Sequence, residues 1–172
     1  EFIDFLLDNK AAFDLTGAKG MEILRKSAQC GAARLFQAIA EKGDRLFADE
    51  NANNFTMYTA ISGGSLDIVK MLMARDIPVK HIRDNKGWRP IHQAALNGHS
   101  AMIDFLMKNG ADLNVRTPSG KSAYNIAGEA GRKDAQELIV KLGGDPSPQQ
   151  FPELRGPYLG QPAPAQNPSI FA

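Results

Sequence analysis

The chain of 172 residues has little cysteine, little histidine, almost no excess charge and no long apolar run. One cysteine, Cys30, excludes an internal disulfide and leaves the redox compartment open. Twenty basic residues stand against nineteen acidic ones, and a net charge of +1 gives no field that would hold nucleic acid or anionic lipid by charge alone. No apolar run approaches the roughly 20 residues of a membrane span, so we expect no membrane-spanning helix.

The three histidines do not form a metal or acid–base site. His92 and His99 are seven residues apart across the helix-breaking Gly98, so they belong to different elements. No third ligand stands at zinc spacing from them. We therefore expect no metal and no cofactor.

The remaining candidates for catalysis are also weak. Cys30 precedes a glycine at a helix end, and Lys26 alone does not make the electropositive setting of a reactive thiol. Ser119-Gly120-Lys121-Ser122 contains part of a phosphate loop, but Val115 stands where that loop needs its first glycine. No nucleophile, base and orienting group can be assembled, so we expect no enzyme and no catalytic residue.

What the sequence does contain is a skeleton that recurs about every 33 residues. In the stretch 84–116 a turn with Gly87 precedes a short helix begun by Pro90, and Gly98 separates it from an apolar-striped helix that ends at Gly110. Moved forward by 33 residues, these glycines fall on Gly120, Gly131 and Gly143. A fixed period of this size indicates a solenoid of stacked helical repeats.

The segment Pro90-Ile91-His92-Gln93-Ala94-Ala95-Leu96-Asn97-Gly98-His99, followed by Gly110-Ala111-Asp112-Leu113-Asn114, resembles an ankyrin repeat. The resemblance covers residues 1–145 and is strongest in 84–116. It implies an all-α ankyrin-repeat solenoid that serves as a binding module and not as an enzyme. It also implies that His92 and His99 hold hydrogen bonds between the helix start and neighbouring loops.

We expect residues 1–145 to form one domain of stacked repeats. A partial repeat at about 1–16 is expected to be the outer helix of an otherwise missing unit, so the chain is either processed or an excised piece. In the last repeat Gln136 stands where Ile103 packs, which suits an end repeat that faces solvent. The complete repeats are predicted at 17–50, 51–83, 84–116 and 117–145.

The first two complete repeats are less regular than the third. In the first, we expect Gly20 in the turn and an inner helix over 23–28. In the second, Thr56 is the expected N-cap of an inner helix that runs through Ile61, and Ser65 is the expected cap of the outer helix.

The composition changes after Asp145, and residues 146–172 are predicted to be a proline-rich extension. Seven of the ten prolines lie there, which excludes a helix. Apolar residues such as Phe151 and Tyr158 indicate that part of it lies against the solenoid. The stretch 151–161, with 168–172, resembles the segment that precedes β-propeller domains in some secreted bacterial proteins. That resemblance implies a periplasmic or extracellular location in a bacterium.

The resemblance to ankyrin repeats implies that partners meet the turn tips and the exposed end of each inner helix. Phe55 and Trp88 stand at equivalent positions of adjacent repeats, and an aromatic pair on a grooved face is typical of a binding hot spot. Three roles remain open for this pair: contact with a partner, burial of tail residues such as Tyr158, and packing that shelters the neighbouring turns. The predicted partner-binding residues are Asn53, Phe55, Asn85, Lys86, Trp88, Leu96, Asn97, Ser119, Lys121 and Glu129.

The expected function is protein–protein recognition through the turn tips and the inner-helix face. The alternative is an accessory or structural domain of a larger secreted bacterial protein, with a β-propeller domain beyond it and the tail docked on the solenoid. The expected partner is a protein, the chain's own tail or an adjacent domain, and not nucleic acid.

Overall fold

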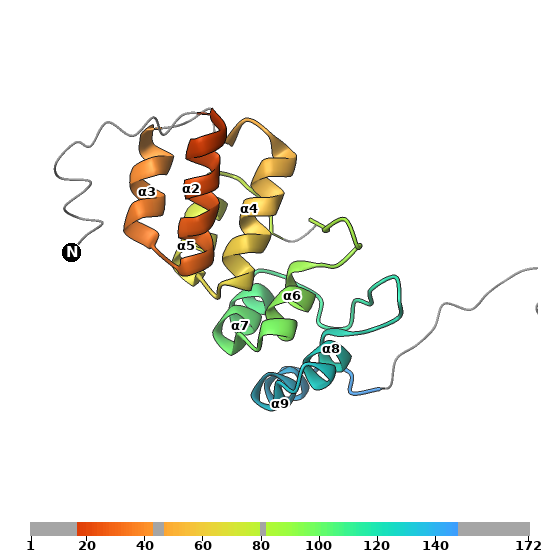
Figure 1. The fold of residues 1–172 in the computed structure, drawn as a ribbon. Helices are drawn as coiled ribbons and strands as arrows, with labels where there is room; N and C mark the ends of the chain where they lie inside the picture. The colour runs from red at the N-terminus through yellow and green to blue at the C-terminus, as the bar shows by residue number, and fades with distance from the viewer. Residues whose placement is uncertain (1–16, 43–46, 80–81, 148–172) are drawn as a thin grey trace, which may run out of the picture.

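The computed structural model describes residues 17–42, 47–79 and 82–147, which form a stack of four helix pairs (Figure 1). The prediction of an all-α solenoid is confirmed. The predicted partial repeat at 1–16 lies outside the described residues, as does nearly all of the proline-rich extension. The inner helices are α2 (Gly17–Cys30), α4 (Glu50–Ser62), α6 (Pro90–Asn97) and α8 (Ala123–Glu129), and the outer helices are α3 (Ala33–Lys42), α5 (Leu66–Met73), α7 (Ser100–Lys108) and α9 (Lys133–Lys141).

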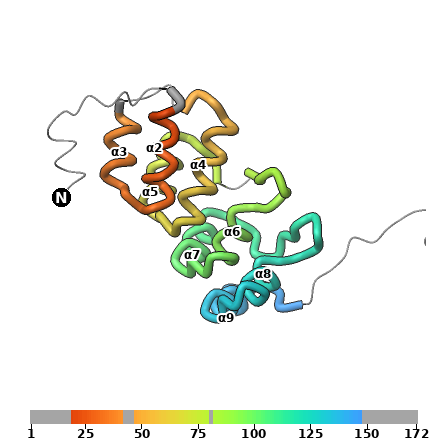
Figure 2. Tube along the Cα trace, viewed as in Figure 1, coloured from red at the N-terminus to blue at the C-terminus, as the bar shows by residue number. Residues whose placement is uncertain are grey.

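The helices stack in two layers, because inner helices contact inner helices and outer helices contact outer ones. In each repeat the chain passes along the inner helix and returns along the outer helix (Figure 2). Apolar side chains at helical spacing fill the space between the layers, and one continuous core runs through all four pairs. Its largest fully buried members include Leu24, Phe36, Ile61, Met102 and Ile139. Each pair therefore buries its apolar face on its neighbours, as a solenoid requires.

A polar side chain links each helix pair to the one before it. In three successive repeats, a residue just after the glycine that separates the two helices reaches a carbonyl oxygen near the C-terminus of the preceding inner helix. These links explain why Ser65 does not cap α5 with its side chain, although it stands at the N-cap position. The three links join Ser65 Oγ to Ala28 O at 2.8 Å, His99 Nε2 to Ser62 O at 2.8 Å, and Arg132 Nε to Leu96 O at 3.3 Å.

The inner helices of the first two repeats begin earlier than the sequence predicts. α2 runs from Gly17, so Gly20 lies inside a helix and not in a turn. α4 is capped by Asp49, whose carboxylate accepts hydrogen bonds from two backbone N–H groups of the first turn. The prediction of Thr56 as N-cap is wrong, because this residue is buried in mid-helix and its hydroxyl donates to Ala52 O at 2.8 Å. Carboxylate capping starts α4 early, and no glycine or proline interrupts it before Gly63.

The third repeat keeps the predicted turn tip, and the next repeat packs onto it. Gly87 has a φ of 75° and its N–H donates to Asp84 O at 2.9 Å. A Cβ at Gly87 would lie 2.7 Å from Cγ of Pro118, which belongs to the turn tip of the next repeat. In that tip Thr117 occupies the position that Asp84 has in this one, 33 residues earlier. This close approach allows the two tips to stack, and it requires glycine at position 87 for space as well as for backbone conformation.

Asp76 occupies a position where the later repeats have glycine, and it should destabilise the chain. Its φ is 60°, and no other non-glycine residue of the described ranges has a positive φ. The equivalent Gly110 and Gly143 have φ values of 83° and 90°. We expect Asp76→Gly to raise the free energy of unfolding by about 0.5 kcal/mol, because glycine adopts this conformation without steric cost.

Chemical denaturation followed by circular dichroism would measure this effect. The matched control is Gly143→Asp, since a Cβ there meets no atom within 4 Å and only the backbone penalty is added. That control should lose stability. A loss of stability in Asp76→Gly as well would contradict the assigned backbone conformation.

The last outer helix presents a polar surface, in agreement with its prediction as an end repeat. Lys133, Glu137 and Lys141 are exposed on α9. Gln136 is half-buried, and its Nε2 donates to Tyr124 O at 3.3 Å. In the part of the chain that the structure describes, every helix is too short or too polar to cross a membrane.

Candidate functional site

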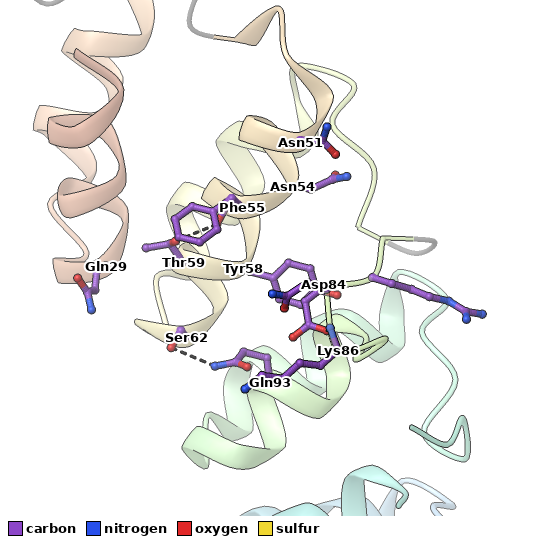
Figure 3. A pocket seen from close by; sticks show the side chains of 12 residues that line it. Gln29, Asn51, Asn54, Phe55, Tyr58, Thr59, Ser62, Asp84, Lys86 and Gln93 are labelled. Carbon is purple, nitrogen blue, oxygen red and sulfur yellow. Dashed lines mark hydrogen bonds between the residues drawn. The ribbon is translucent and has the colours of Figure 1, made fainter. Parts of the chain in front are cut away.

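A groove of about 510 Å³ lies between α4, the C-terminal end of α2 and the segment 82–89 (Figure 3). Gln29 approaches from α2, while α4 contributes one face along most of its length. The segment 82–89 forms the opposite wall and carries the turn tip. The lining residues are Gln29, Asn51, Asn54, Phe55, Tyr58, Thr59, Ser62, Arg83, Asp84, Asn85, Lys86 and Gln93.

Phe55 is the main apolar feature of this groove. Its side chain is 57% exposed, whereas the other large apolar residues of the described ranges are buried or half-buried, Val140 on α9 excepted. The guanidinium carbon of Arg25 lies 4.7 Å from the centre of the Phe55 ring, a distance at which a cation is attracted to an aromatic face. Phe55 and Arg25 therefore form a platform that is apolar and positively charged at once.

Tyr58 fixes the distance between α4 and the opposite wall. Its hydroxyl lies 2.5 Å from the carbonyl oxygen of Trp88 and 3.3 Å from that of Ile82. Burial raises the pKa of Tyr58 above its usual value, and the nearby Asp84 carboxylate acts in the same direction. The hydroxyl therefore remains protonated and continues to donate a hydrogen bond to the wall.

Asp84 holds the turn tip in its conformation. Its Oδ1 accepts hydrogen bonds from the backbone N–H of Lys86 at 2.9 Å and from that of Trp88 at 2.7 Å. Asn85 and Lys86 are exposed at the rim as a result. The Asp84 carboxylate thus holds the backbone of this wall, while the rim side chains remain accessible.

Three of the predicted binding residues, Phe55, Asn85 and Lys86, are brought together in this groove. Trp88 does not line it. The indole ring of Trp88 is half-buried and lies edge-on to His92, with ring centres 6.1 Å apart. The predicted equivalence of Phe55 and Trp88 is wrong, because Phe55 lies on α4 and Trp88 lies in the extended segment before α6.

The other predicted binding residues lie outside the groove. Asn53 is half-buried on α4 and not in a turn tip, and its Nδ2 donates to Phe47 O at 2.8 Å. Lys121 and Glu129 form an ion pair at 2.6 Å in the following repeat. Their part in binding stays a prediction, as it does for Leu96 and Asn97 at the end of α6 and for Ser119 in the last tip.

The sequence reasoning missed several groove residues on α4. Asn51, Asn54 and Tyr58 follow one another at intervals of three and four residues, so they lie on one face of a helix. This spacing is visible in the sequence. In a helix that begins at Glu50, this spacing indicates a common surface.

The histidines have the structural roles that the resemblance implied. His92 Nδ1 accepts from the backbone N–H of Arg89 at 3.0 Å, so its Nε2 donates to Val115 O at 2.9 Å. Burial lowers the pKa of His92, and the neutral ring suits this pair of bonds. Among the residues with described positions, no three histidine, cysteine or acidic side chains are placed to hold a metal ion.

Comparison with known proteins matches residues 57–150 to a family model described as ankyrin repeats, three copies. The chain is 30% identical over 130 residues to the palmitoyltransferase AKR1 of Lachancea kluyveri, covering 73% of this chain and 17% of that protein. It is 27% identical over 146 residues to the SH3 and multiple ankyrin repeat domains protein 2 of Homo sapiens, covering 84% of this chain and 8% of that protein. It is 29% identical over 105 residues to the protein phosphatase 1 regulatory subunit 27 of Mus musculus, covering 59% of this chain and 68% of that protein.

Proposed function

Because the chain belongs to the ankyrin-repeat family of interaction modules, we propose that it binds a protein partner through the groove between α2, α4 and the segment 82–89. The chain spans less than a fifth of the first two relatives, so their activities as whole proteins are not transferred to it. Relatives whose names describe a regulatory subunit and a multidomain protein support an interaction role.

The observation that carries this proposal is the exposed ring of Phe55 inside a groove. Apart from Val140, the other large apolar side chains of the described ranges are buried or half-buried, and Phe55 has the Arg25 guanidinium on its ring. Aromatic and arginine side chains in a partly enclosed setting are the residues that most often dominate binding energy.

The groove is also preorganised. Tyr58 ties α4 to the carbonyl oxygens of the opposite wall, and the Asp84 carboxylate fixes the tip. A partner that enters a surface held in this way orders few additional residues. Less conformational entropy is lost on binding, and more of the contact energy appears as affinity.

Phe55→Ala is expected to weaken binding of the partner at least about 10-fold, because it removes the apolar centre of the groove. A partner captured from an extract of the source organism would be titrated against the native chain and the variant by calorimetry. Circular dichroism should show an unchanged fold, since the ring is largely exposed.

The matched control is Val140→Ala on α9, the other exposed large apolar side chain of the described ranges. It should leave the affinity unchanged. Equal affinities of the native chain and of Phe55→Ala would reject the groove as the binding surface.

The accessory role beside a β-propeller domain and the bacterial periplasmic or extracellular location remain predictions. Both depend on the resemblance of the C-terminal extension, whose structure lies outside the described residues.

A further inference from the structure

We propose that the occupant of the groove is an extended, acidic peptide segment of the partner, with an apolar side chain resting on Phe55. This inference deepens the function proposed above and rests on it. Surplus positive charge, a lining of carboxamides and the Phe55–Arg25 platform each favour such a ligand.

The charges around the groove favour an acidic ligand. Arg25, Arg83 and Lys86 border it, and none of these side chains forms an ion pair with an acidic residue of the described ranges. The one acidic lining residue is Asp84, whose Oδ1 already accepts two backbone N–H groups. The surface thus presents more cationic than anionic groups, and complementary charge both selects a partner and speeds its arrival.

The polar lining suits the backbone of an extended peptide. Five lining residues carry carboxamides, and a carboxamide offers a donor and an acceptor, as a peptide group does. Gln93 is oriented by a hydrogen bond from its Nε2 to Ser62 Oγ at 3.2 Å. Such groups can pair with a peptide chain whatever its side chains are.

The platform of Phe55 and Arg25 indicates which side chains the peptide needs. The exposed part of the ring offers an apolar surface, and the guanidinium beside it can take a carboxylate through paired N–H groups. An aliphatic or aromatic residue close to an aspartate or glutamate would use both. A nucleic acid fits less well, because three cations beside one carboxylate provide few phosphate contacts.

A library of random dodecapeptides displayed on phage would test this assignment. Selection on the native chain should enrich aspartate and glutamate over lysine and arginine, together with an aliphatic or aromatic residue. The most enriched peptide would be synthesised, and its affinity measured by fluorescence anisotropy. The double variant Arg83→Glu, Lys86→Glu should bind it about 10-fold more weakly at low salt.

The double variant Lys133→Glu, Lys141→Glu on α9 is the control, since it makes the same charge change on exposed residues at the end of the stack. It should bind the peptide as the native chain does. Equal losses in the two double variants would overturn the assignment, because the effect would then depend on net charge and not on the groove.

The selection also separates this inference from the proposed function. Peptides that lack acidic residues but are lost in Phe55→Ala would overturn the acidic ligand and leave the groove as a binding surface. If the native chain retains no peptide better than Phe55→Ala does, both fail. Binding of a fluorescent oligothymidylate, abolished in the groove double variant, would overturn the peptide as the ligand class.

Discussion

Replacing Gly63 by alanine is expected to lower the free energy of unfolding by about 3 kcal/mol. The added Cβ would lie 2.2 Å from the carbonyl oxygen of Gln29 and 2.9 Å from its carbonyl carbon. These are backbone atoms of α2, so no rotamer change relieves the clash and the two inner helices must separate. The backbone conformation is not the cause, because Gly63 has a φ of −79°.

Gly131→Ala is the matched control for this result. Gly131 has a φ of 68°, and a Cβ there meets no atom within 4 Å. Its replacement should cost only the backbone penalty, about 1 kcal/mol. Urea denaturation of both variants would measure the difference, and a Gly63→Ala loss no larger than the Gly131→Ala loss would contradict the close contact between the end of α4 and α2.

His92→Ala is expected to destabilise the chain by about 3 kcal/mol. The side chain is fully buried, so its removal leaves a cavity. It also leaves the Arg89 N–H and the Val115 carbonyl without the partners that His92 provides. His99→Ala should cost less, because that ring is half-buried and makes one hydrogen bond, to Ser62 O. Denaturation of the two variants side by side would show the order, and the reverse order would contradict it.

The pKa of His92 adds a pH dependence of known sign. Burial lowers this pKa below its usual value of 6.5, so the unfolded chain binds a proton more readily than the folded chain does. The contribution of His92 to stability is complete above pH 6.5, and it is lost as the pH falls from there through the pKa of the folded state. Denaturation midpoints at about pH 7.5 and about pH 5 should therefore differ more in the native chain than in His92→Gln.

The later repeats could be predicted from the sequence because their turns depend on local backbone requirements. Gly87, Gly98 and Gly110 all have positive φ, a conformation that few other residues adopt. Gly98 and Gly110 follow α6 and α7, and Gly87 lies in the turn before α6, so the recurrence of these glycines predicts the turns directly. Pro90 begins α6 as expected, since proline lacks the N–H group that the first helical turn leaves unpaired.

The start of α4 and the groove could not be predicted in the same way. Asp49 and Thr56 are both acceptable N-caps, and the choice between them depends on how the helix packs against α2. With Thr56 as the expected cap, Asn51 and Asn54 fall before the predicted helix, and only Tyr58 of this face falls inside it. The partners of Tyr58 lie 24 and 30 residues away, and no local pattern indicates contacts of that range.

The three side chains that link successive helix pairs differ in how far water reaches them. In a linear array, each unit is held by its own stability and by its coupling to its neighbours. Ser65 makes its link in a buried setting, His99 in a half-buried one, and Arg132 at an exposed position where water competes for the same carbonyl. Of the three links, the one that joins α9 to the end of α6 is the most accessible to water. If the Arg132 link opens, water can satisfy the Leu96 carbonyl, whereas the Ala28 carbonyl loses its partner if the buried Ser65 link opens.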